Sequence, residues 1–177
     1  RAALISIFQR ASDREVLLAS LPALDPSRHW PLVELQFRTV FGSLNYWGDK
    51  DQWFRYGDEA LAALRRLGGN RARSLFHYCI KLGGDQCCFS ICDVLDKTKG
   101  EWDKEFLWPM LSNKGTMMYR SHYVKPNNYA LYLSTRVCDA AAEVISKHRK
   151  DVTFNIVGTT KELDSQIQRM RRQLGIV

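Results

Sequence analysis

The sequence lacks any apolar run that approaches the roughly 20 residues a helix needs to cross a bilayer. It also lacks a secretory signal with a recognisable cleavage pattern. We therefore expect no membrane span. Because the chain begins with Arg1 and not with Met, we expect that a leader or a preceding domain has been removed or left out, so targeting is not readable.

Motifs that would commit the chain to a chemistry are also missing. There is no Cys-x-x-Cys pair, no P-loop ending after the glycine pairs, and no Ser-x-Gly elbow or His-Glu-x-x-His motif. The four histidines fall in different predicted elements: His29, His77, His122 and His148. We expect no cofactor and no catalytic residues, while an enzyme whose site is assembled from residues distant in sequence stays open.

The cysteines form a pattern that argues against both disulfides and zinc. Their number, five, is odd, and Cys87, Cys88 and Cys92 crowd into one helical pattern, whereas a secreted disulfide framework spreads cysteines between loops. We expect a reducing intracellular compartment, which can be cytoplasm, nucleus or organelle matrix. A metal site that adds His77 and Cys79 lacks two separated ligand pairs, and the apolar spacing favours core packing.

Acidic residues are fewer than basic ones, at 19 Asp and Glu against 26 Lys and Arg. The net charge is therefore +7, and the sequence pI is about 9.3. This imbalance favours an anionic partner, such as RNA, DNA, an acidic protein or a membrane surface.

The clearest positive signal is a four-residue motif, typical of a break between two helices, that occurs twice. The two copies are Leu67-Gly68-Gly69-Asn70 and Leu82-Gly83-Gly84-Asp85. Glycine can take the left-handed conformation that ends a helix, and Asn or Asp can cap the next helix. With the helical spacing of apolar residues around both copies, this predicts three helices joined by short loops, which pack as antiparallel hairpins. An earlier helix is expected to open at Trp30-Pro31, with proline at its first position.

The character of the sequence changes near Gly115. Residues 116–124 predict a strand, a helix is expected from Pro126 to about His148, and residues 152–157 alternate like a strand before a last helix. The predicted fold class is mainly α: a solenoid-like array of antiparallel helical hairpins over residues 1–113, and a small β-α-β-α portion over residues 116–177 that docks on the helices.

Three groups of basic residues are candidate anion-binding sites. One group flanks the first glycine pair, where a helix N-terminus favours negative charge. The other two lie near the C-terminus, where the same cations would also fit helix ends or a solvated face. The candidate nucleic-acid or anion-binding residues are Arg65, Arg66, Arg71, Arg73, Lys147, Arg149, Lys150, Arg169, Arg171 and Arg172.

Two further features are candidates for binding. Tyr119, His122 and Tyr123 lie beside basic residues and could stack on unpaired bases, although core or interface packing explains them better. In the last helix an apolar seam steps by four, three and four residues and could hold a partner helix. The seam consists of Leu163, Ile167, Met170 and Leu174.

These observations predict a non-enzymatic, intracellular binding module of a larger assembly, which contacts RNA or a ribonucleoprotein through its basic patches. The alternative is a protein–protein interaction scaffold that uses helix grooves or the C-terminal seam to hold other protein subunits. The two differ in one respect: RNA binding falls steeply with salt, whereas binding through an apolar seam does not.

Overall fold

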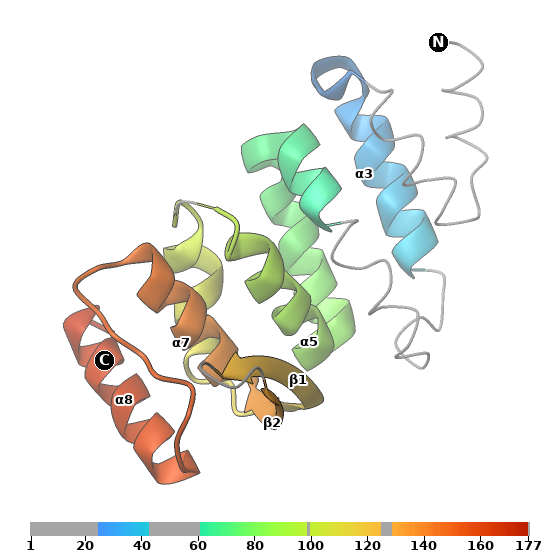
Figure 1. The fold of residues 1–177 in the computed structure, drawn as a ribbon. Helices are drawn as coiled ribbons and strands as arrows, with labels where there is room; N and C mark the ends of the chain where they lie inside the picture. Colours follow the sequence, from blue (N-terminus) through green and yellow to red (C-terminus); the bar gives the residue numbers. More distant parts are fainter. Residues whose placement is uncertain (1–24, 43–60, 99, 125–128, 177) are drawn as a thin grey trace. The chain divides into compact units, whose positions relative to one another are not determined.

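The computed structural model describes residues 25–42, 61–98, 100–124 and 129–176, which are mainly α-helical, as the sequence predicts (Figure 1). The chain divides into two compact units, Arg1–Ser90 and Ile91–Val177, and each unit is described by itself. The domain boundary predicted near Gly115 stays a prediction. No helix in the described ranges is long and apolar enough to cross a membrane.

In the first unit, helix α3 (Pro26–Gly42) buries Trp30, Val33 and Phe37, which lie on one face of the helix. The helix starts earlier than the expected opening at Trp30-Pro31. The carbonyl of Asp25 accepts hydrogen bonds from the N–H groups of Arg28 (3.2 Å) and His29 (2.8 Å), so the first turn is already closed there. Pro31 consequently lies inside the helix.

Side-chain contacts hold α3 to the beginning of α5 (Arg73–Leu95). The Arg38 guanidinium lies 4.7 Å from the centre of the Tyr78 ring and 2.8 Å from the Glu34 carboxylate. The same carboxylate accepts a hydrogen bond from the Ser74 hydroxyl at 3.3 Å. These polar contacts flank the apolar core of the unit, which consists of Trp30, Val33, Phe37, Leu61, Leu64, Ala72, Leu75, Phe76 and Cys79 together with buried residues 87–89.

Both glycine pairs interrupt helical geometry, as predicted. Residues 61–68 are helical, Gly69 has a φ of 50°, and the 3-10 turn η3 (Gly69–Ala72) leads into α5. Within α5, Gly84 has a φ of 52° and a ψ of −135°, which breaks the helix into two segments. Asn70 lies inside the 3-10 turn, so it does not occupy the position before α5 that the sequence suggested.

Gly68 has a different reason for lacking a side chain. A Cβ at this position would lie 2.3 Å from the buried ring of Trp30. The first glycine of this pair therefore permits the close approach of α3, and the second permits the left-handed backbone.

The second unit contains the last turn of α5, the π-helix η4 (Asp103–Leu107), α6 (Trp108–Met110), β1 (Thr116–Val124), β2 (Tyr129–Arg136), α7 (Val137–His148) and α8 (Thr160–Gln173). β1 and β2 pair antiparallel, with a register irregularity between Met117 and Arg120. Helix α7 is the centre of this unit, because it contacts β2, η4, α6 and α8. Its first N–H groups donate to the carbonyls of Asn113 and Gly115, both at 2.8 Å.

The predicted β-α-β-α order of residues 116–177 is wrong. The segment expected to begin a helix at Pro126 is strand β2 from Tyr129 to Arg136, and the helix starts only at Val137. Pairing with β1 satisfies the backbone of this segment and overrides its helical apolar spacing. Residues 152–157 form no regular strand. The main chain of Asn155 makes its hydrogen bonds with the side chain of a glutamine and not with a neighbouring strand. A solenoid of hairpins is not shown by the described residues.

The apolar seam of α8 is covered by the protein's own chain. Leu163, Ile167, Met170 and Leu174 are all buried, with exposed fractions between 1% and 9%, and α8 packs against α7. The interpretation of this seam as an open groove for a partner helix is therefore wrong, since its apolar surface is already removed from water.

All five cysteines are free and buried, and the chain forms no disulfide. Burial raises the pKa of the Cys88 thiol to about 11, with a smaller contribution from Asp85, and raises that of Cys138 to about 11, with Asp139 adding to the effect. A high thiol pKa is the opposite of what a reactive cysteine needs.

Candidate anion-binding surface

Helix α8 presents a basic face whose position is set at its first turn. The Thr159 N–H and hydroxyl donate to the Glu162 carboxylate at 2.7 and 2.8 Å, and the Glu162 N–H donates back to the hydroxyl at 3.3 Å. This is a capping box, and the hydrogen bonds from Thr159 lower the pKa of Glu162. The Thr-x-x-Glu spacing is visible in the sequence, although it was not among the predicted features.

Lys161 lies in this first turn beside Glu162 and is exposed. Further along α8, Arg169 and Arg172 are exposed, and Arg171 is half-buried. The second carboxylate of the helix, Asp164, is held by other cations, as described below. From residue 165 to residue 177 the sequence contains no Asp or Glu, so the C-terminal half of the helix is positively charged.

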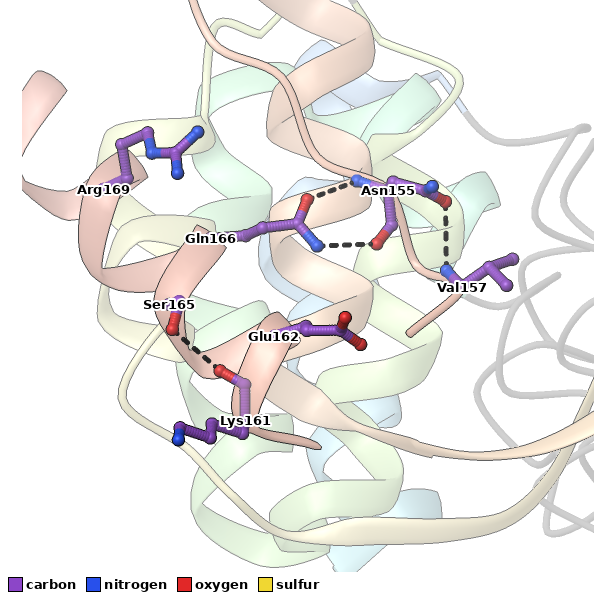
Figure 2. Close-up of a pocket in the computed structure, with 7 residues that line it drawn as sticks. All are labelled: Asn155, Val157, Lys161, Glu162, Ser165, Gln166 and Arg169. Carbon is purple, nitrogen blue, oxygen red and sulfur yellow. Dashed lines mark hydrogen bonds between the residues drawn. The ribbon is translucent and has the colours of Figure 1, made fainter. Parts of the chain in front are cut away.

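Two open hollows lie along this face. The first, of about 530 Å³, is lined by Asn155, Val157, Lys161, Glu162, Ser165, Gln166 and Arg169 (Figure 2). The second, of about 660 Å³, is lined by Thr160, Lys161, Asp164, Ser165, Gln168, Arg169 and Arg172. Lys161, Ser165 and Arg169 border both hollows, so this row of residues forms a ridge between them. At 1.5 Å per residue the ridge spans about 12 Å along the helix axis.

The wall opposite the ridge in the first hollow is the segment from Asn155 to Val157, which is fixed by side-chain amides. Figure 2 shows Gln166 reaching from α8 to the main chain of Asn155, where it accepts from the N–H at 2.8 Å and donates to the carbonyl at 3.1 Å. The Asn155 side chain accepts from the Val157 N–H at 3.1 Å. Sequence reasoning missed Asn155 and Gln166, because a pairing across 11 residues leaves no periodic signal.

The basic residues predicted at the end of α7 mainly form ion pairs with acidic residues of the same chain. Lys147 pairs with Asp96 at 2.9 Å and with Glu143 at 3.6 Å. Arg149 donates twice to Asp151, at 3.0 and 2.6 Å, which raises the arginine pKa and lowers the aspartate pKa. These ion pairs do not extend to Lys150, which is exposed.

The remaining basic candidates lie in the other unit. Arg66 and Arg71 are exposed, whereas Arg65 and Arg73 are half-buried. They surround η3 and the start of α5, as the sequence predicted, but how this cluster sits relative to α8 is not determined.

The predicted stacking residues Tyr119, His122 and Tyr123 all lie in β1. His122 pairs with Leu131 and Tyr123 with Ala130 in the register of the hairpin. Their side chains lie outside what the structure describes, so their role in stacking stays a prediction.

A buried ion network stands beside the basic face. Arg136 is only 9% exposed and donates to both oxygens of Asp139, each at 2.8 Å, and to Asp164 at 2.6 Å. Lys114 lies 3.3 Å from the same Asp164 carboxylate. The hydrogen bonds from Arg136, and less so from Lys114, lower the pKa of Asp164, while the hydrogen bond to Asp139 raises the pKa of Arg136.

This network borders a smaller cavity of about 220 Å³ between the first turns of α7 and α8. It is lined by Thr116, Thr135, Arg136, Asp139, Ile156, Gly158, Thr160 and Leu163. Because Arg136 is already bonded to two carboxylates, its charge is not available to an anion entering the cavity. The cavity therefore lacks the charge that distinguishes the α8 face.

A second buried pair joins η4 to the end of α7. Nδ1 of His148 lies 3.0 and 2.9 Å from the two oxygens of Asp103, and both side chains are less than 10% exposed. An aspartate can orient a histidine in this way for acid–base chemistry, but both side chains of this pair are buried. It serves to pin α7 to the π-helix.

Among the described residues, no group of three or more His, Cys, Asp and Glu side chains could hold a metal ion. The α8 face is instead suited to an anion or to a polar molecule that carries negative charge. Comparison of the chain with protein-family models, with curated proteins and with solved structures finds no match.

Proposed function

We propose that the protein is a non-enzymatic binding module of a larger assembly in a reducing compartment, and that it contacts RNA or a ribonucleoprotein through basic surfaces. The observation that carries this proposal is the α8 face, where Lys161, Arg169 and Arg172 are exposed beside two open hollows. The exposed Arg66 and Arg71 provide a second basic surface on the other unit. The array of helical hairpins predicted for residues 1–113 would serve as the frame that carries it.

The α8 face fits an extended anion better than a single ion. A ridge of about 12 Å carries Lys161 near one end and Arg169 near the other, so it can meet more than one phosphate of an extended strand. Arg169 and Arg172 are three residues apart on the helix and point to one side of it, since both line the second hollow. A phosphate backbone supplies negative charge at regular intervals along such a row.

A salt titration of RNA affinity tests the proposal. If the three α8 cations contact phosphates of a single strand, they contribute about −2 to the slope of log affinity against log salt, at about −0.7 per phosphate. The variant Arg169→Ala/Arg172→Ala should bind more weakly and flatten the slope by about 1.4.

The matched control is Lys97→Ala/Lys104→Ala, which removes the same charge from exposed positions of the same unit. It should leave the slope close to that of the wild type. Equal slopes for the two double variants would contradict a specific role for α8, and an affinity independent of salt would contradict RNA binding altogether. In that case the scaffold alternative would be favoured, with an interface other than the buried seam.

A further inference from the structure

The second hollow of the α8 face contains one acidic residue, Asp164, and both of its oxygens are already engaged. Oδ1 lies 2.6 Å from the Arg136 guanidinium, and Oδ2 lies 3.3 Å from the Lys114 ammonium. With Asp139, which Arg136 also binds, these side chains form a network in which each carboxylate has a cation beside it. An anion that enters the second hollow therefore meets no uncompensated carboxylate.

The cations of the same hollow remain available. Lys161, Arg169 and Arg172 line it, and none of them forms an ion pair with an acidic residue of the described part of the chain. Lys161 and Arg172 are 11 positions apart, which is about 16 Å along the helix axis. The first hollow differs, because the Glu162 carboxylate borders it and Val157 gives it an apolar wall (Figure 2). The second hollow is thus the better place for a chain of anionic groups.

The remaining lining of the second hollow is neutral and polar, and it consists of Thr160, Ser165 and Gln168. Ser165 donates its hydroxyl proton to the Lys161 carbonyl at 2.8 Å, so its oxygen still has lone pairs to accept a hydrogen bond. The Gln168 side-chain amide has no partner within the described ranges, and it can both donate and accept. Among the described residues that line this hollow, none is aromatic or aliphatic, so it offers no surface on which a base would stack.

We propose that the second hollow holds the ribose–phosphate backbone of RNA and leaves the bases outside. Lys161, Arg169 and Arg172 contact phosphates. Ser165 and Gln168, which lie between these cations in the sequence of the helix, exchange hydrogen bonds with ribose 2′-hydroxyls. The 2′-hydroxyl is both a donor and an acceptor, and it is the group by which a protein distinguishes RNA from DNA. The inference rests on the proposed function and specifies how the same surface recognises its ligand.

The decisive variant removes the two neutral groups and leaves every charge in place. In Ser165→Ala/Gln168→Met, alanine lacks the acceptor oxygen and methionine keeps an unbranched side chain without the amide, and both residues favour a helix. The matched control, Ser146→Ala/Gln173→Met, makes the same two exchanges at helical positions that line neither hollow. Ser146 also donates to a carbonyl of its own helix at 2.8 Å, and Gln173 is exposed.

The experiment measures fluorescence anisotropy of labelled oligo(U) and oligo(dU), each of about 12 nucleotides, with the full chain near neutral pH and low salt. These two probes carry the same base and differ only in the 2′-hydroxyl. The wild type and the control should bind oligo(U) about three- to tenfold more tightly than oligo(dU), as expected for one or two neutral hydrogen bonds. The variant Ser165→Ala/Gln168→Met should lose this preference by binding oligo(U) more weakly, while its affinity for oligo(dU) stays unchanged.

A wild-type ratio close to one, or a ratio that the variant leaves unchanged, would overturn the proposal. Partial unfolding of the variant would lower both affinities by the same factor, so the ratio still reports the contact to the hydroxyl. Labelled oligo(C) gives a second check, because a backbone site should bind it as tightly as oligo(U). A tenfold difference between the two RNAs would show that bases are read and would contradict the proposal.

The outcomes also separate this inference from the proposed function. If the wild type binds no RNA at low salt, the proposed function fails. If it binds oligo(U) and oligo(dU) equally, with a steep salt dependence that Arg169→Ala/Arg172→Ala flattens, only the contact to the ribose fails. Should Ser165→Ala/Gln168→Met bind neither probe, the single variant Gln168→Met decides: an unchanged ratio overturns the proposal, and a lowered ratio supports it.

Discussion

Removing the Arg136 guanidinium should destabilise the protein far more than removing that of Arg149, although both make the same forked contact with a carboxylate. Arg136 donates Nε and Nη2 to Asp139, each at 2.8 Å, and Arg149 donates the same two nitrogens to Asp151 at 3.0 and 2.6 Å. The side chains of the first pair are 11% and 3% exposed, whereas those of the second are 39% and 59% exposed. The two forks therefore differ in burial, and Arg136 in addition donates to Asp164 at 2.6 Å.

The magnitude follows from what Asp139 would retain. In Arg136→Ala its carboxylate loses both charge-assisted hydrogen bonds and keeps the Arg136 backbone N–H at 3.3 Å and the weak Cys138 thiol contact at 3.9 Å. Breaking one side of a buried pair leaves a charge without compensation and costs about 3 to 5 kcal/mol. In Arg149→Ala the aspartate stays in water, so no measurable change is expected.

Urea denaturation followed by the fluorescence of tryptophan, including the buried Trp102 of the same unit, measures both effects. With a slope of about 2 kcal/mol per molar, Arg136→Ala should lower the urea midpoint by about 2 M, and Arg149→Ala should not shift it. A second comparison, Arg136→Lys, should recover only part of the loss, because an ammonium cannot form the fork. If Arg136→Ala and Arg149→Ala shift the midpoint equally, the buried Arg136 network does not contribute more to stability than the exposed Arg149 pair.

Three further outcomes are expected. Gly68→Ala should cost about 1 to 3 kcal/mol in the free energy of unfolding, because the new methyl overlaps the Trp30 ring, and a stability equal to wild type would contradict that packing. Native protein should not react with a thiol reagent near pH 8, since Cys88 and Cys138 have a pKa of about 11 and all five cysteines are buried, whereas denatured protein should titrate five thiols. The folded pKa of Asp164 lies below its unfolded value of about 3.9, so its contribution to stability is complete above that pH and is lost as the pH falls through the folded pKa. The stability difference between wild type and Asp164→Asn should accordingly be constant from neutral pH to about pH 5 and shrink in more acidic solution; a difference that grows on acidification would show the opposite sign of the shift.

The local features of the fold were predictable because they depend on neighbours in the sequence. The paired glycines at 68–69 and 83–84 specify where helical geometry ends, since only glycine adopts the required positive φ without cost. The 4-3-4 spacing of Leu163 to Leu174 identified an apolar face of the last helix, and in the structure this face is buried while Arg169 and Arg172 are exposed.

Only the tertiary structure decided what those faces contact. The seam of α8 looked like an interface for a partner because the sequence does not reveal that α7 covers it. The segment from Tyr129 to Arg136 carries apolar residues at helical spacing, yet it is a strand, because pairing with β1 supplies hydrogen bonds that a helix would have made internally. The sequence suggested that Lys147 and Arg149 are available to bind an anion, but in the structure they form ion pairs with Asp96 and Asp151.

Contacts between residues far apart in the sequence belong to the same class of features. Gln166 and Asn155 are 11 residues apart, Asp103 and His148 are 45 apart, and Arg136 and Asp164 are 28 apart. Periodicity and capping rules act over a few residues, so the sequence alone indicated where helical geometry is interrupted and which residues of the last helix form its apolar face. Pairings at these longer separations form only when the chain folds back on itself, and so the tertiary structure alone decided which polar groups are consumed internally and which remain to meet a ligand.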